Sequence, residues 1–270
     1  MDLSQNIVSY RCIFDNNVTI KIIKYTGNNT EVIKMYNFYN GGCLLLREPK
    51  KRQIISNLIN KNIINKNKNF IDGGAFLGDT SLPISLNING IVYAIDPGDI
   101  NVDIIKNLAE INNIKNIKIL KYCLGFANEM LFYNYGPYGS NFASFSNIAG
   151  NYTHSIESIS LDELHNRKII ENIDFVHIDV ENLENEVLKG SYNIIKIYNP
   201  VIIFEGHIKT CTHKVNECCD FLKNMDYIIY MIDEDAGNPG DARNFMGIPK
   251  QRSDYFKNNF DCFDFIRLVE

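Results

Sequence analysis

The sequence lacks several features that would place it in a special class of protein. It has no apolar run approaching the roughly 18 residues of a membrane-spanning helix, so we expect no helical membrane anchor. Residues 1–6 lack the basic and apolar regions of a signal peptide. The seven cysteines are an odd number without the spacing of a disulfide framework. Together these absences predict a protein with reduced thiols in the cytoplasm.

An excess of basic residues is also missing. The formal net charge is −5, which argues against nucleic acid as a non-specific partner. Hydrophobic residues make up 45% of the 270 positions and charged residues 22%, values typical of a globular protein with a sizeable core. The sequence shows no repeat and no heptad run, and it gives no information on oligomeric state.

The order of predicted elements divides the chain in two. Residues 1–48 contain short β-prone runs separated by Asn/Gly turns, which predicts a small β-rich cap. In residues 49–270, helical segments alternate with short apolar strands, which predicts a Rossmann-like, doubly wound and mainly parallel α/β sheet. Its strands are expected at residues 70–72, 91–96, 117–122, 175–179 and 201–205. Two late strands, 227–233 and 245–248, predict an antiparallel hairpin at the C-terminal edge.

A glycine-rich turn follows the first strand of the predicted sheet. Residues 69–80 read Asn-Phe-Ile-Asp-Gly-Gly-Ala-Phe-Leu-Gly-Asp-Thr, the strand–turn–helix pattern of nucleotide-binding α/β proteins. Gly73 and Gly74 can take positive φ and let a ligand approach the backbone, whereas Gly78 leaves room for helix packing.

The turn departs from two familiar nucleotide-binding patterns. No Gly-Lys-Ser/Thr follows it, so it is not a P-loop. Ala75 occupies the central glycine position of a dinucleotide fingerprint, and Asp72 just before the turn would repel a pyrophosphate. A carboxylate there suits an ammonium or sulfonium cation, which favours S-adenosylmethionine over NAD.

More carboxylates lie at the predicted strand ends. Asp96 ends the second strand, where it can accept hydrogen bonds from ribose hydroxyls. Asp179 and Glu205 end two later strands, and Glu181 and His207 follow just beyond. Because ligands of open α/β sheets bind beyond the carboxyl ends of the strands, we expect these groups to line one site. Each of them alone also fits a solvated strand end or a helix cap.

Residues 135–153 are rich in Gly, Ser, Asn and aromatic residues and show no clear period. We expect a long irregular loop here, which is often a functional lid. Its aromatic side chains either stack on a sugar or base, or pin the loop to the core; these residues are Tyr135, Tyr138, Phe142, Phe145 and Tyr152.

As a set, these motifs resemble the FkbM-type methyltransferases. The resemblance covers about residues 44–249 in the right order and rests on the stretches 70–80, Tyr-Ala-Ile-Asp-Pro at 93–97, Ser-Leu-Asp-Glu-Leu at 160–164, 173–190, 200–205 and 243–249. It implies methyl transfer from S-adenosylmethionine, most often to an oxygen, with a small-molecule or glycan acceptor. The cofactor-binding residues are then expected to be Asp72, Gly73, Gly74, Ala75, Gly78, Thr80, Asp96, Pro97 and Leu124.

The sequence departs from the family pattern at three positions. His177 replaces the usual lysine, Asn182 the usual glycine and Asp96 the usual glutamate. Asn182 flanks the expected acceptor side. These departures leave open a cofactor-binding scaffold without catalysis, working as an interaction module. A nicotinamide-dependent oxidoreductase is a further alternative, disfavoured by Asp72, Ala75 and the lack of a Tyr-x-x-x-Lys pair in a plausible helix.

The expected catalytic residues are Asp179, Glu181, Glu205 and His207. A hydroxyl acceptor needs a base or a metal to remove its proton, and Asp179 can serve as either base or ligand. Asp179 and Glu205 are the candidate ligands of a Mg²⁺ ion, although a site without metal is the simpler expectation. His177 is expected to be a packed strand residue. The spacing of Cys211, His213, Cys218 and Cys219 does not fit a zinc site.

Overall fold

The computed structural model describes residues 7–11, 19–23, 48–146, 150–234, 240–260 and 263–269. Its centre is a sheet with the strand order β13-β11-β12-β10-β9-β3-β4-β5. The parallel part comprises β3 (Asn69–Gly73), β4 (Val92–Ile95), β5 (Ile117–Leu120), β9 (Ile173–Ile178) and β10 (Val201–His207). The mainly parallel α/β sheet predicted from the sequence is therefore confirmed.

The antiparallel edge of the sheet is built by the C-terminal residues. β12 (Ala242–Pro249) pairs with β10 on one side and with β11 (Tyr227–Ile232) on the other, so the predicted hairpin is confirmed. A short strand that the pattern did not reveal, β13 (Ile266–Leu268), pairs with β11 and forms the outermost position. β12 thus lies inside the sheet, where its polar residues can reach the site described below.

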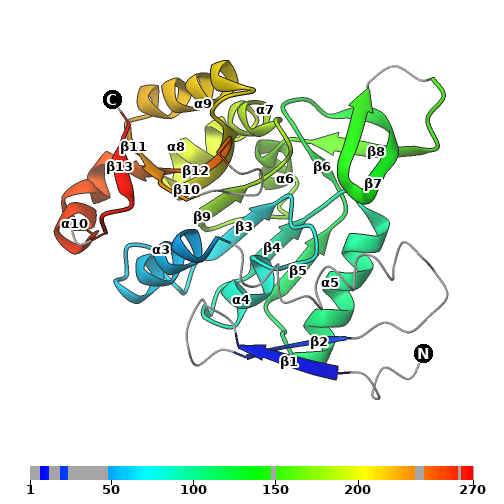
Figure 1. Cartoon of the computed structure of the whole chain (residues 1–270), viewed down its shortest axis with the longest axis horizontal. Helices are drawn as coiled ribbons and strands as arrows, with labels where there is room; N and C mark the ends of the chain where they lie inside the picture. The colour runs from blue at the N-terminus through cyan, green and yellow to red at the C-terminus, as the bar shows by residue number, and fades with distance from the viewer. Residues whose placement is uncertain are drawn as a thin grey trace.

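Helices cover both faces of the sheet (Figure 1). One apolar cluster joins the sheet to α3 (Pro49–Asn60), α4 (Ser81–Ser85), α5 (Asp99–Ile111) and α10 (Lys250–Phe260). A second cluster joins the opposite face to α6 (Leu161–Asn166), α7 (Glu184–Lys189), α8 (Tyr192–Tyr198) and α9 (Thr212–Asn224). Neighbouring residues of a strand point to opposite faces, and Phe175 and Val176 of β9 accordingly belong to different clusters.

Two smaller strand groups flank this core. β1 (Ile7–Arg11) and β2 (Thr19–Ile23) form an antiparallel hairpin, as predicted for the start of the β-rich cap. The hairpin is tied to the end of α5, because Asn112 accepts a hydrogen bond from the Lys21 amide at 2.7 Å and donates one to the Lys21 carbonyl at 2.8 Å. The other predicted cap strands lie outside the described residues, and the domain boundary at residue 48 stays a prediction.

The second group is a sheet in the order β6-β8-β7, and it corrects one expectation. β7 runs over Glu129–Ser146 and pairs with β8 (His154–Ile159), while β6 is Cys123–Leu124. Residues 135–146 are therefore strand, and the prediction of an irregular loop over them is wrong. The aromatic residues that suggested a lid are also strong strand formers, and this propensity outweighs the interspersed Gly and Pro. The side chains of Tyr135, Tyr138, Phe142 and Phe145 lie outside the description.

Candidate active site

Polar side chains replace apolar ones along a single face of the sheet, toward the carboxyl ends of its parallel strands. Phe70, Phe175, Ile203 and Met246 belong to the apolar cluster on the α3 side. On each of these strands, the residue two positions nearer the site is polar; these residues are Asp72, His177, Glu205 and Asn244. Since side chains two residues apart share a face, these four polar residues continue the same surface. The pairings Asp72↔His177 and Glu205↔Asn244 place them side by side.

The glycine turn packs directly against the end of β9. Gly74 has φ +80, and a Cβ atom there would lie 1.7 Å from the carbonyl oxygen of Asp179. The Asp179 amide donates to the Gly73 carbonyl at 2.9 Å. The turn predicted to hold the cofactor and the strand end predicted to face the acceptor are therefore adjacent. Leu124 joins them, because its Cδ1 atom lies 2.6 Å from where a Cβ of Gly73 would be.

The other predicted cofactor residues lie around the same turn. Gly78 also has φ +80; Ala75, in the turn, and Thr80, just before α4, are buried. Pro97 is half-buried after β4. The structure thus brings these residues together with Asp72, Gly73 and Gly74, while their contacts to a cofactor stay a prediction.

Asp72 is buried and held by protein groups. Its Oδ1 accepts a hydrogen bond from Nδ1 of His177 at 2.7 Å, and its Oδ2 accepts one from the Ser81 hydroxyl. Burial by itself raises the pKa of Asp72, but the hydrogen bonds and the charge of His177 outweigh it and hold the pKa below the ordinary value. His177 is packed within the strand, as predicted, and it also positions Asp72.

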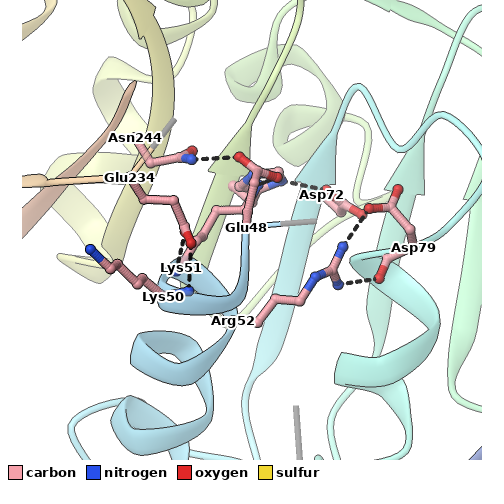
Figure 2. Close-up of polar contacts among 9 residues, drawn as sticks. Glu48, Lys50, Lys51, Arg52, Asp72, Asp79, Glu234 and Asn244 are labelled. Atoms are coloured by element: carbon pink, nitrogen blue, oxygen red, sulfur yellow. Dashed lines mark hydrogen bonds and ion pairs between the residues drawn. The ribbon is translucent and has the colours of Figure 1, made fainter. Parts of the chain in front are cut away.

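Helix α3 contributes charged groups that sequence reasoning missed (Figure 2). Lys51 is buried, and its ammonium nitrogen lies 2.6 Å from Oε2 of Glu48 and 3.4 Å from Nε2 of His177. Asn244 donates to Oε1 of Glu48 at 2.6 Å. Burial would raise the pKa of Glu48, but Lys51 and Asn244 lower it to about 2. Glu48 and Lys51 therefore form an ion pair under the polar strand ends.

Arg52 extends this layer toward the glycine turn. It is fully buried and donates to the carbonyl oxygen of Asp79 at 2.6 Å and to its Oδ2 at 2.7 Å (Figure 2). The turn is thus clamped to α3. The spacing of the sequence could have predicted that both cations are buried. Lys51 precedes Ile55 by four residues and Arg52 precedes Ile59 by seven, so both lie on the buried face of the helix.

Asp96 is buried and already engaged. It accepts hydrogen bonds from the amides of Phe76 and Gly98, both at 2.8 Å, and from the Asn101 side chain at 2.9 Å. Burial raises its pKa to about 6 despite these bonds. A carboxylate offers about four acceptor positions, so one remains for a ribose hydroxyl. Asp96 joins the glycine turn to the start of α5, a structural role that the sequence did not reveal.

The expected acceptor side combines Asp179 and Glu205. Burial raises the pKa of Asp179, while the charges of Lys51 and His177 act in the opposite direction. Burial and the nearby Asp179 raise the pKa of Glu205 to about 10. Glu205 was expected to end its strand, with His207 beyond it, but β10 continues to His207 because β12 pairs with it as far as Ala242.

The turn after Asp179 explains an unusual residue of the sequence. Glu181 and Asn182 have φ 56 and 73, in the left-handed region where asparagine is among the best tolerated residues. Asn182 therefore keeps the conformation that a glycine would supply. Glu184 fixes this turn by accepting from the amides of Val180 at 3.0 Å and Asn182 at 3.3 Å. Glu181 is exposed at the rim of the site.

Within the described ranges, no group of three or more His, Cys, Asp or Glu side chains is arranged to hold a metal ion. Of the residues considered for zinc, Cys218 and Cys219 are buried in the apolar cluster under α9.

No helix in the described part of the chain is long and apolar enough to cross a membrane.

Comparison with known proteins identifies the class. The family model of the methyltransferase FkbM domain matches residues 72–229, more than half of the chain. The chain therefore belongs to the FkbM methyltransferase family, and the matched region with its glycine turn is an S-adenosylmethionine-dependent methyltransferase domain. The search of curated proteins found no match.

The solved structures that are similar to this chain include three methyltransferases. A methyltransferase FkbM from Methylobacillus flagellatus KT is similar at 14% identity and a TM-score of 0.50, over 81% of this chain and 55% of that one. This chain thus spans about half the length of that relative. An O-methyltransferase from Bacillus cereus in complex with SAH has 13% identity and a TM-score of 0.48, over 83% and 92% of the two chains. A SAM-dependent methyltransferase from Aquifex aeolicus has 13% identity and a TM-score of 0.46, over 80% and 97%.

Proposed function

We propose that this protein transfers a methyl group from S-adenosylmethionine to a hydroxyl group of a glycan or small molecule. One observation carries the proposal: the glycine turn at Gly74 touches Asp179 at the end of β9, where the chain order of the sheet reverses. Ligands of open α/β sheets bind at such a switch point. A cofactor on the turn would therefore present its reactive end to the carboxyl groups of β9 and β10.

The charge of this edge fits a cationic cofactor. Among the described residues, the buried and half-buried carboxyl groups of the polar layer outnumber its cations, Lys51 and Arg52; these carboxyl groups are Glu48, Asp72, Asp79, Asp179 and Glu205. Carboxylates buried together disfavour each other's charge unless a cation joins them. The ammonium and sulfonium groups of S-adenosylmethionine supply such cations, whereas the pyrophosphate of a nicotinamide cofactor would add negative charge.

The acceptor edge has the groups that proton removal requires. S-adenosylmethionine, when bound, supplies an activated methyl group, and the electron pair of the broken S–C bond stays on sulfur. Alignment of the acceptor then contributes most of the rate, and a base must take the hydroxyl proton as the O–C bond forms. We assign this orientation and proton uptake to the edge that contains Asp179. Glu205, with its raised pKa, is protonated at neutral pH and can donate a hydrogen bond to the acceptor oxygen.

A magnesium ion is the alternative means of activating the hydroxyl. Asp179 and Glu205 would bind it, but a protonated Glu205 and the nearby ammonium of Lys51 make a poor set of partners for a cation. We therefore propose a metal-independent reaction. Treatment with EDTA should leave turnover unchanged, and a loss that magnesium restores would instead assign the proton removal to the ion.

Two assays test the proposed function. Calorimetric titration with S-adenosylmethionine, S-adenosylhomocysteine and NAD should show binding of the first two only. Turnover should then be measured by mass spectrometry on panels of glycans, small hydroxyl compounds and RNA, with an increase of one methyl group on a hydroxyl acceptor as the expected result. Binding without turnover on any panel would favour a non-catalytic module, and binding of NAD alone would favour an oxidoreductase.

The free thiols support a proposal on location. Cys123, Cys218 and Cys219 are buried and unpaired in disulfides, as expected in a reducing compartment. We propose that the protein works in the cytoplasm.

A further inference from the structure

His207 on β10 has one ring nitrogen engaged and the other left open. Its Nδ1 lies 3.3 Å from Oδ2 of Asp241, the residue before β12. Its Nε2 is buried and has no hydrogen-bond partner among the described residues. The nearest carboxyl oxygen to Nε2 on the same strand is Oε2 of Glu205, at 3.8 Å. The open nitrogen therefore faces the acceptor edge.

Asp241 is itself held in place by the loop after β10. Its carboxylate accepts hydrogen bonds from the Lys209 amide at 2.7 Å, from the Thr210 amide at 3.2 Å and from the Thr210 hydroxyl at 2.7 Å. The Thr210 hydroxyl is the main reason that the pKa of Asp241 lies at about 2. At neutral pH this carboxylate is ionised and can only accept hydrogen bonds.

An acceptor-only partner decides which nitrogen of His207 carries the proton. Nδ1 must be the donor toward Asp241, so Nε2 of the neutral ring keeps its lone pair. Among the described residues, Glu205 on β10 and Asp241 just before β12 place carboxyl groups against the ring.

We propose that Asp241 is a positioning residue that holds His207 in the Nδ1–H tautomer, so that Nε2 can take the proton of the methyl acceptor. This inference rests on the proposed methyltransferase function. As the new O–C bond forms and the S–C bond breaks, the hydroxyl proton moves to Nε2, and Asp241 stabilises the resulting imidazolium. The proton then leaves to solvent. Asp179 orients the acceptor beside this base, and Glu205 donates a hydrogen bond to the acceptor oxygen.

The tautomer can be measured without cofactor or substrate. Two-bond ¹⁵N–¹H spectra of the full chain distinguish Nδ1–H from Nε2–H, and the His207→Gln variant, which lacks the signal, assigns it. Wild type should show Nδ1–H. In Asp241→Asn the side-chain amide can donate to Nδ1, so the ring should shift toward Nε2–H. With an acceptor identified, kcat should fall roughly 10²-fold or more, while KM and S-adenosylmethionine affinity stay unchanged.

Thr210→Val is the matched control, because it removes one hydrogen bond to Asp241 and leaves the contact with His207 intact. It should keep the wild-type tautomer and kcat. An Nε2–H tautomer in wild type would overturn the proposal even if Asp241→Asn did not fold. Unchanged tautomer and kcat in a folded Asp241→Asn would also overturn it. A protein that shows the Nδ1–H tautomer but binds no S-adenosylmethionine would contradict the proposed function instead.

Discussion

The ammonium nitrogen of Lys51 lies 3.4 Å from Nε2 of His177, and this contact joins helix α3 to the polar ends of β3 and β9. His177 in turn donates from Nδ1 to Asp72, so α3 is linked through His177 to Asp72. The site thus receives a cation from a segment that precedes the family-matched region, residues 72–229. α3 therefore contributes to this site although it lies outside the matched residues.

Removal of this cation should destabilise the fold strongly. Lys51→Met keeps most of the side-chain volume but leaves the ionised Glu48 buried without its partner. Breaking a buried ion pair in this way costs about 3–5 kcal/mol. Urea unfolding at neutral pH measures the change in the free energy of unfolding.

The adjacent Lys50 provides the control for this variant. Its ammonium donates to the Asp233 carbonyl at 2.8 Å, in a half-buried position without a buried carboxylate to neutralise. Lys50→Met should therefore cost only about 0.5–1.5 kcal/mol, the usual value of a single hydrogen bond. Equal costs for the two variants would show that the Lys51 ion pair does not hold α3 to the site.

Asp96 is expected to bind the ribose hydroxyls with its remaining acceptor position. Asp96→Asn keeps the shape and removes the charge, so S-adenosylmethionine affinity should fall by about 1–3 kcal/mol. Calorimetry measures this loss, and urea unfolding reports how far the bonds to Phe76 and Gly98 have also weakened. Asp99→Asn, an exposed change at the start of α5, should leave the affinity unaltered. An affinity equal to wild type in Asp96→Asn would rule out the ribose assignment.

Glu205 should make stability depend on pH. Its pKa in the folded protein, about 10, lies above the ordinary 4.5, so the native state holds its proton more tightly than the unfolded state. The resulting stabilisation is complete below about pH 4.5 and is lost as the pH rises toward 10. One proton changes the free energy of unfolding by at most about 1.4 kcal/mol per pH unit.

The Glu205→Gln variant has a neutral amide at this position, which does not titrate. Its free energy of unfolding should therefore rise relative to wild type with each step from pH 5 to pH 9. Chemical denaturation of both proteins across this range provides the comparison. Two curves that run parallel would mean that Glu205 titrates at its ordinary pKa and is not the protonated group assigned here.

Local patterns in the sequence predicted the scaffold of the site. Of the two glycines expected to allow a positive φ, Gly74 has one and Gly73 does not, and Asp72, Asp96 and Asp179 lie at the predicted edge. The apolar strand runs were sufficient because burial on both faces of a parallel sheet leaves a clear signal. Their ends were less certain, since β10 extends to His207 only through its pairing with β12.

Contacts between distant segments could not be predicted in the same way. Lys51 and His177 are separated by 126 positions, and nothing local to either residue indicates the other. The helical spacing of Lys51 predicted its burial at most, without identifying its partners. Asp241 follows Gly-Asn-Pro-Gly in the sequence and resembles an ordinary loop residue until the fold brings it to His207.

The turnover of Asp179→Asn relative to wild type tests most directly whether the edge containing Asp179 orients and activates the methyl acceptor. Asp174→Asn serves as control, because it alters a buried carboxylate at the other end of the same strand, where its partners include Arg252, Lys68 and the Asn65 amide. The control should lose stability but keep its turnover per folded molecule. Asp179→Asn should fold, bind S-adenosylmethionine as wild type does, and lose roughly 10²–10⁴ in turnover. Wild-type turnover in Asp179→Asn, or its failure to fold, would contradict the account and make Asp179 a structural residue.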